Sequence, residues 1–264
     1  SIVVGGLGKG TGSGAGPELL KITKELGVTT LCVVTMPASI EGNKTYENAT
    51  KSYEKYKRNG TSVCVVDNEK IYGNNSELTL NQGFAKSNHE VANIVGDIIN
   101  IVSCGSKINI DIADLKRFLS ENKLLTHLTI DLTNEEYRDK KLAAKLEKAI
   151  IDASLKSCFS SKEVNVMLNI SINNETPTAI FNDISTALKE ITKNPKINIV
   201  FGSDTISGNS NSISLFISNE EEDANIKLLK KSPEQDPTYI DPFADDEELQ
   251  SSGVKQNLFD LGKD

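Results

Sequence analysis

The sequence predicts an α/β protein made of a parallel-sheet domain, a long central helix, a smaller α+β domain and an acidic tail. Three observations predict this class. Short apolar runs alternate with helical patterns in the first part of the chain, as in a parallel sheet with crossover helices. One long helical pattern follows, and after it the apolar runs become alternating. We expect the three parts to span residues 1–105, 106–219 and 220–264.

The first part reads as three strands with helices between them. Strands are expected over 2–4, 29–35 and 63–66, each a short apolar run. A glycine-rich loop follows the first strand and leads into a helix over 17–26, where Pro17 suits the first turn. The second connection is predicted to be helical from four side chains at helical spacing: Tyr46, Ala49, Tyr53 and Tyr56.

A long helix is expected to begin near Leu80 and to end near Cys104 and Gly105. Its apolar positions follow helical spacing: Val91, Ile94, Val95, Ile98, Ile99 and Val102. Their wide angular coverage predicts a helix that is buried on most sides. A shorter helix is expected to begin near Asp111.

The second part is predicted to form another sheet. Apolar residues occupy every second position of 164–172, which predicts a half-exposed strand; they are Val164, Val166, Leu168, Ile170 and Ile172. Thr176 and Pro177 are expected to cap and open the next helix. The remaining elements are shorter patterns: strands over 128–132, 197–201 and 213–217, a helix over 142–153, and a polar loop over 204–212.

Composition limits the classes of function. No run approaches the ~20 apolar residues that span a membrane, so direct membrane insertion is not expected. The four cysteines are far apart in sequence, which predicts reduced thiols in a cytoplasmic protein and argues against a zinc site or a disulfide framework. The chain opens with Ser1 directly before a strand, so we expect further sequence upstream.

Charge separates the tail from the rest of the chain. The net charge is −8, and residues 220–264 alone hold thirteen Asp and Glu against five Lys. The preceding residues are therefore neutral overall and lack the basic field that nucleic acid needs. We expect the tail to be largely disordered. From Asn257 to its end it regains apolar residues, so 257–261 is a candidate docking peptide, although it is equally compatible with a plain terminus.

The glycine-rich loop is the main chemical signal. It follows a strand and precedes a helix, and it consists of Gly8, Lys9, Gly10, Thr11, Gly12, Ser13 and Gly14. Glycines let backbone N–H groups approach an anion, and the following helix start adds unpaired donors. The spacing fails the P-loop pattern. A dinucleotide fingerprint on Gly10, Gly12 and Ala15 lacks its acidic partner after the next strand. A plain structural turn remains the alternative.

The loop resembles the signature of the tubulin and FtsZ family at six of seven positions, with Lys9 as the departure. The resemblance implies part of a Rossmann-like GTPase domain that binds GTP with Mg²⁺. It places the phosphates on Gly8, Gly10, Thr11, Gly12, Ser13 and Gly14. It also implies that Glu41 contacts the ribose, that Asn68 faces the nucleotide, and that Phe84 stacks on the guanine.

A second motif resembles FtsZ more closely than tubulin. Asn109, Asp111 and Asp114 match the family's N-x-D-x-x-D loop, which reaches into the neighbouring subunit. The resemblance implies that these residues are catalytic. Spacing alone also allows Asp111 to cap the next helix and Asp114 to be a favourable acid in its first turn. Both roles can hold together.

Two positions depart from the family inside the expected pocket. His89 stands where the family has an Asp that reads the guanine edge, and Thr45 stands where it has an Arg. The resemblance implies a self-assembling, cytoplasmic GTPase of bacterial cell division at the division site. Its partners would be further copies head to tail, and a membrane-tethering protein on 257–261. The alternatives are a non-catalytic polymer-interface fragment, a plasmid or phage DNA-segregation relative, and a nicotinamide enzyme.

Overall fold

A seven-stranded sheet runs through the part of the chain that the computed structural model describes. That part comprises residues 1–59, 62–73, 77–102, 108, 110–121, 124–153, 164–194, 196–206, 208 and 210–218. The strand order is β1-β2-β3-β4-β7-β5-β6. The strands are β1 (Ile2–Gly6), β2 (Leu31–Met36), β3 (Ser62–Asp67), β4 (Leu124–Thr133), β5 (Val164–Ile172), β6 (Ile197–Thr205) and β7 (Ser210–Ser218).

The direction of the strands divides the sheet. Strands β1 to β4 are mutually parallel, whereas β7 runs antiparallel to its neighbours β4 and β5. The direction changes between β4 and β7, whereas the shortest pairing lies within the parallel group, where β3 pairs with β4 only through Val63–Leu124 and Cys64–Leu125. The mixed α/β class is therefore confirmed, and the domain boundary near residue 105 stays a prediction.

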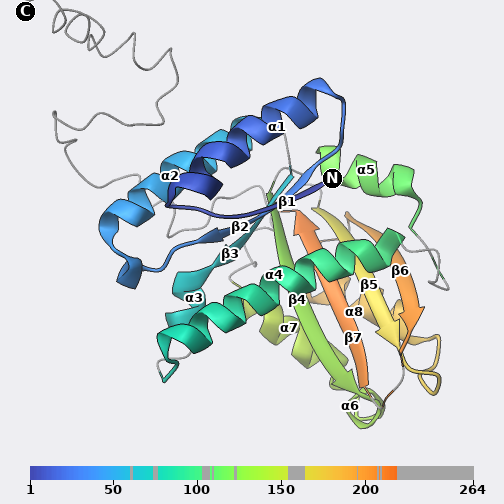
Figure 1. The fold of residues 1–264 in the computed structure, drawn as a ribbon. Helices are drawn as coiled ribbons and strands as arrows, with labels where there is room; N and C mark the ends of the chain where they lie inside the picture. The colour runs from blue at the N-terminus through green and yellow to red at the C-terminus, as the bar shows by residue number, and fades with distance from the viewer. Residues whose placement is uncertain are drawn as a thin grey trace, which may run out of the picture. The chain divides into compact units, whose positions relative to one another are not determined.

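Helices cover both faces of the sheet. The longer ones are α1 (Gly16–Glu25), α2 (Asn43–Arg58), α4 (Leu80–Val102), α5 (Ile112–Glu121), α7 (Leu142–Asp152) and α8 (Ile180–Thr192). Helix α4 lies across the sheet on one face, and α7 and α8 lie on the other (Figure 1). None of the described helices is long and apolar enough to cross a membrane.

Two expectations about burial were wrong. Strand β5 is buried on both faces, because Val166 and Leu168 pack with α7 and α8 while Met167 packs on the α4 side. Helix α4 is less buried than expected. Its first half buries only Gly83 and Ser87, and its apolar contacts are concentrated at Ile94, Ile98 and Ile101, which face the sheet.

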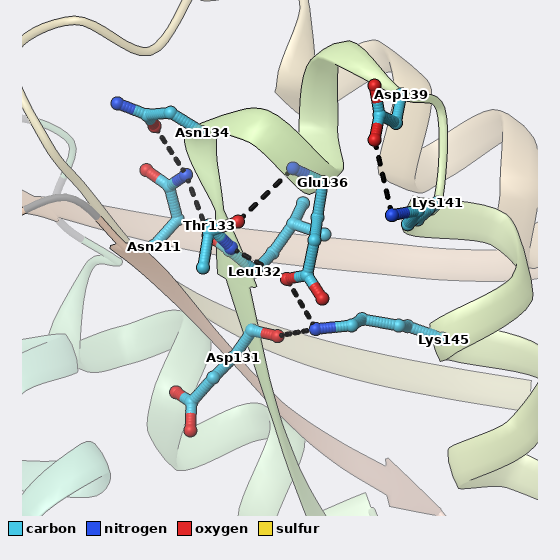
Figure 2. Close-up of polar contacts among 9 residues, drawn as sticks. All are labelled: Asp131, Leu132, Thr133, Asn134, Glu136, Asp139, Lys141, Lys145 and Asn211. Carbon is cyan, nitrogen blue, oxygen red and sulfur yellow. Dashed lines mark hydrogen bonds and ion pairs between the residues drawn. The ribbon is translucent and has the colours of Figure 1, made fainter.

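Thr176 does not cap a helix. Helix α8 begins at Ile180, after an uncapped Ala179, and the Thr176 hydroxyl donates to the Asn211 Oδ1 at 2.7 Å. Asn134 joins the same buried group, because the Asn211 Nδ2 donates both to its Oδ1 and to the Leu132 carbonyl (Figure 2). A polar residue that looked like a cap therefore donates into a buried group of amides at the ends of β4 and β7.

The end of β4 carries a helix cap that we did not predict, although Thr133 and Glu136 have the T-x-x-E spacing that signals it. The Thr133 hydroxyl accepts from the Glu136 backbone N–H, and the Glu136 carboxylate accepts from the Thr133 N–H at 2.9 Å. Lys145 donates to that carboxylate at 2.6 Å and to the Asp131 carbonyl at 2.8 Å (Figure 2). This capping box opens the short helix α6 (Asn134–Arg138).

The tail predicted over 220–264 lies outside the described residues. The candidate peptide 257–261 and the cysteines Cys104 and Cys158 lie outside them as well. The other two cysteines, Cys32 and Cys64, are buried free thiols on neighbouring strands.

Candidate functional site

Most of the predicted site residues gather where β1, β2 and β3 end. The register pairs Gly6 with Thr35 and Met36 with Asp67, so the three carboxyl ends lie side by side. The glycine loop leaves β1 there, and Asn68 follows β3 directly. Ligands of open parallel sheets bind at this edge.

The glycine loop folds back on itself before α1. The Gly8 N–H donates to the Ser13 Oγ at 2.8 Å, and the Ser13 N–H donates to the Lys9 carbonyl at 3.2 Å. Gly8 has φ of 99°, a left-handed conformation that glycine adopts without strain. Residues Thr11–Ala15 form a wide helical turn that continues into α1, so the loop ends on a helix N-terminus. The Lys9 side chain is exposed.

Helix α2 braces the loop from behind. The Tyr56 hydroxyl donates to the Gly12 carbonyl at 2.8 Å, and the Ser52 hydroxyl donates to the Ser13 carbonyl at 3.1 Å. Helical spacing predicted that Tyr56 is buried, but it carried no sign that its hydroxyl reaches the loop. Both carbonyls are held on the α2 side, where they accept hydrogen bonds.

Close packing explains why particular glycines are needed. A Cβ at Gly12 would lie 2.0 Å from the Gly6 carbonyl oxygen, whereas a Cβ at Gly10 would meet nothing within 4 Å. A Cβ at Gly8 would lie 2.6 Å from Thr45, so α2 also contacts the loop through its first turn. Gly12 is therefore required by the fold, and Gly10 leaves open space beside the helix start.

Glu41 and Asn68 meet beside this loop. The Glu41 Oε1 accepts from the Ala38 N–H at 3.1 Å and, at 3.4 Å, from the Asn68 Nδ2. Asn68 is 95% buried, since its exposed fraction is 5%, and its Oδ1 has no hydrogen-bond partner among the described residues. A buried acceptor without a donor costs free energy, so this oxygen is suited to a ligand's N–H or O–H.

Phe84 lies on the exposed side of α4. Its ring is 37% exposed and meets the Tyr72 ring edge to face, with centroids 6.5 Å apart. The Tyr72 hydroxyl donates to the Leu80 carbonyl at 3.1 Å, and the ring packs so tightly on Gly83 that a Cβ there would lie 2.2 Å away. Tyr72, from α3 (Asn68–Gly73), is a neighbour of Phe84 that sequence reasoning missed. His89 is exposed on α4, the helix that carries Phe84.

Asp111 and Asp114 do not join this group. Both are exposed at the start of α5, where the Asp111 Oδ1 accepts from the Ala113 N–H at 3.1 Å. The other end of α5 meets the beginning of β3, because the Ser62 hydroxyl donates to the Leu119 carbonyl. Helix α5 therefore packs at the amino ends of the parallel strands, whereas the glycine loop follows their carboxyl ends (Figure 1). Asn109 lies outside the described residues.

The cradle fits a phosphate group. It offers a helix N-terminus, a bent glycine backbone and open space at Gly10, and Asn68 beside it offers an unused acceptor. A nucleotide presents phosphates together with N–H and O–H donors, which matches both features.

Known proteins with similar sequences share one family name. Residues 1–76 match the family model described as Tubulin/FtsZ family, GTPase domain. The cell division protein FtsZ of Aquifex aeolicus is 30% identical over 198 residues, which cover 75% of this chain and 53% of that protein. The chain thus spans about half the length of that curated relative.

Solved structures agree on the fold. A structure titled as an empty FtsZ dimer of M. jannaschii has a TM-score of 0.69 at 21% identity, covering 83% of this chain and 62% of that one. GDP-form protofilaments of Bacillus thuringiensis serovar israelensis TubZ have a TM-score of 0.67 at 15% identity, covering 87% and 63%. Residues 1–76 therefore carry the match to the Tubulin/FtsZ GTPase domain, and the chain as a whole is similar to FtsZ in sequence and to FtsZ and TubZ in fold.

Proposed function

We propose that this chain works as a filament-forming GTPase, in which GTP is hydrolysed between neighbouring subunits. One observation carries the proposal. A braced anion cradle stands at the carboxyl ends of the parallel strands, and exposed carboxylates stand on a helix that packs at their amino ends. Two copies stacked head to tail would bring the two halves together. Contacts of this kind do not close on themselves and give open polymers.

Nucleotide binding uses the first half of the site. The loop residues Gly8, Gly10, Thr11, Gly12, Ser13 and Gly14 surround the phosphates at the start of α1. The N–H groups of Gly8 and Ser13 already donate within the loop, so the phosphates bind the other N–H groups. Glu41 accepts from the ribose, Asn68 offers its free oxygen, and Phe84 supplies an exposed ring for the base. Mg²⁺ bound to the phosphates would supply charge neutralisation during hydrolysis.

Hydrolysis uses the second half, from the next subunit. Asp111 and Asp114 orient and polarise a water molecule for in-line attack on the γ-phosphate, with Asn109 beside them. The Asp111 side chain is held by its bond to the Ala113 N–H, so a capped helix start fixes the direction of the carboxylate. Neither subunit contains a complete site, and activity should therefore depend on assembly.

The cellular setting follows the curated relative, which is a cell division protein. We place the filament in the cytoplasm at the division site, with 257–261 as the peptide that docks on a membrane-tethering partner. Plasmid or phage DNA segregation, the alternative that the sequence leaves open, is a second setting. Localisation of the tagged protein at the septum, or on a segregating plasmid, would separate the two.

Conservative substitutions test the catalytic assignment. Asn caps helices as well as Asp does, so Asp111→Asn together with Asp114→Asn keeps the cap and removes the charge. We expect GTP hydrolysis per assembled filament to fall about 100-fold or more, with unchanged unfolding and assembly. Asp139→Asn, another exposed carboxylate, is the matched control. Undiminished hydrolysis by the double variant would remove Asp111 and Asp114 from the mechanism.

A non-catalytic interface module is the second candidate, favoured by His89, which stands where the resemblance implies an Asp that reads the guanine edge. GTP titration of this chain decides between the two. Saturable GTP binding that is lost in Gly12→Ala supports the nucleotide-binding function. Assembly without any GTP binding supports the interface module.

A further inference from the structure

A buried histidine joins helix α4 to the sheet. His127, on β4, has a side chain that is only 1% exposed. Its Nδ1 lies 2.9 Å from the Glu90 Oε1, and its Nε2 lies 2.8 Å from the Asp97 Oδ2. Glu90 and Asp97 are seven residues apart on α4, so two turns of that helix face one imidazole ring.

A proton on each ring nitrogen lets the ring donate to both carboxylates. A neutral imidazole has one N–H, and its other nitrogen is a lone-pair acceptor that would face a carboxylate oxygen. An imidazolium ion donates to both carboxylates at once, as charge-assisted hydrogen bonds. The distances of 2.8 and 2.9 Å fit such bonds.

Among the described residues of the sheet, the groups recorded beside the ring are uncharged. From β3, the Cys64 thiol lies beside the site, and burial first, then the Glu90 carboxylate, raise its pKa to about 12, so it stays neutral. From β5, the Asn169 Nδ2 donates to the Asp97 Oδ1 at 3.2 Å. From β7, the Phe216 ring packs on the imidazole with centroids 4.8 Å apart. The neighbours of His127 on β4 itself, 125–129, are uncharged.

We propose that Glu90, His127 and Asp97 form a proton-operated clamp that fixes helix α4 against strands β4 and β5. The clamp lies in the middle of α4. Phe84 and His89 precede it on that helix, and the segment that leads to Asp111 follows the helix. Loss of the proton leaves a neutral ring against two carboxylates, which releases α4 from its register on the sheet. The clamp stands whether or not the chain hydrolyses GTP.

The direction of the pH response follows from the contacts. Burial lowers the pKa of His127, but hydrogen bonds and charge attraction from Asp97 and Glu90 outweigh it and hold that pKa above its ordinary value. Stabilisation by the clamp is therefore complete below about pH 6.5 and is lost as the pH rises through the elevated pKa.

The chain contains only two histidines, so ring NMR tests the clamp directly. His89→Gln identifies the signal of His127. We expect His127 to remain an imidazolium above pH 6.5 and its midpoint to fall by about one pH unit or more in Asp97→Asn. The exposed Asp131→Asn on β4 is the matched control and should leave the midpoint unchanged. A neutral His127 at pH 6, or a midpoint insensitive to Asp97, would overturn the clamp.

Hydrogen exchange tests the release of α4. In the unmodified chain, protection factors of amides 91–98 should fall about tenfold or more as His127 loses its proton. In His127→Gln they should be low and independent of pH. If His127→Gln does not fold, Glu90→Gln provides a second variant, in which the protection factors should fall at a lower pH. Protection that stays constant across the His127 midpoint would show that the proton does not hold the helix.

Discussion

The Tyr56 hydroxyl and the Gly12 carbonyl oxygen lie 2.8 Å apart, which joins helix α2 to the middle of the glycine loop. The Tyr56 side chain is fully buried, and burial first, then nearby Cys32, raise its pKa to about 12, so the hydroxyl remains a donor at neutral pH. The same hydroxyl fills the space beside Gly16, where a Cβ would lie 1.7 Å from it. One side chain thus holds both ends of the loop's helical turn.

Tyr56→Phe should therefore loosen the loop while keeping the ring. It leaves the Gly12 carbonyl without its donor, which costs about 1–2 kcal/mol of unfolding free energy. GTP affinity should fall several-fold, as measured by titration and urea unfolding. Thr50→Val on the same helix removes a hydroxyl that donates only to its own helix, at Tyr46, and should leave GTP affinity unchanged. Equal GTP affinity in Tyr56→Phe and the parent would show that the loop needs no brace.

Gly12 and Gly10 form a matched pair within the loop. Gly12→Ala places a methyl group 2.0 Å from the Gly6 carbonyl oxygen and should destabilise the chain by about 2 kcal/mol or more. Gly10→Ala meets no atom within 4 Å and has a helical conformation, so stability should be unchanged or rise by about 0.5 kcal/mol.

Thermal unfolding and GTP titration of both variants separate fold from ligand. If Gly10→Ala is stable but binds GTP more weakly, the open space beside Gly10 is where the phosphates approach. Equal stability of Gly12→Ala and the parent would contradict the observed packing of the loop.

Periodicity predicted the elements well where burial follows one face. Helix α2 buries Tyr46, Ala49, Tyr53 and Tyr56, the four residues that its spacing selected. The order of strands and helices up to α4 also followed from alternating patterns, because each parallel strand is a short apolar run.

Three of the misses have a common cause, which is that the partner lies far away in sequence. Asn169 looked solvent-facing, but it is buried because Asp97, 72 residues earlier, accepts its N–H. Thr176 looked like a cap, yet its hydroxyl donates to Asn211, 35 residues later. His127 carried no motif, since its two carboxylates come from another element. Polar residues in such positions cannot be assigned from local spacing alone.

The buried thiols give a chemical prediction. Burial raises the pKa of both Cys32 and Cys64 to about 12, so neither forms thiolate at pH 8 while the chain is folded. In a Cys104→Ser, Cys158→Ser variant, iodoacetamide should modify neither remaining cysteine without denaturant and both in urea. Mass spectrometry counts the adducts. Rapid modification of Cys32 or Cys64 under native conditions would mean that β2 or β3 opens on its own.

The unpaired Asn68 oxygen should lower the stability of the free chain and contribute to nucleotide binding. Its Oδ1 is buried without a partner among the described residues, so Asn68→Leu removes an unpaired acceptor and should change the unfolding free energy by less than about 1 kcal/mol. Asn173→Leu is the contrasting variant. Its amide bonds to Asn134 at 2.7 Å within the buried cluster, and its loss should cost more than about 2 kcal/mol.

The extra stability that a non-hydrolysable GTP analogue confers on the chain tests the role of Asn68. A ligand that binds only the folded state raises the unfolding free energy in proportion to the logarithm of its affinity. We expect this increment to shrink by about 1–3 kcal/mol in Asn68→Leu, because the ligand loses an acceptor that is already desolvated. An unchanged increment would mean that the nucleotide's donors bind elsewhere. The buried oxygen of Asn68 would then destabilise the fold without contributing to binding.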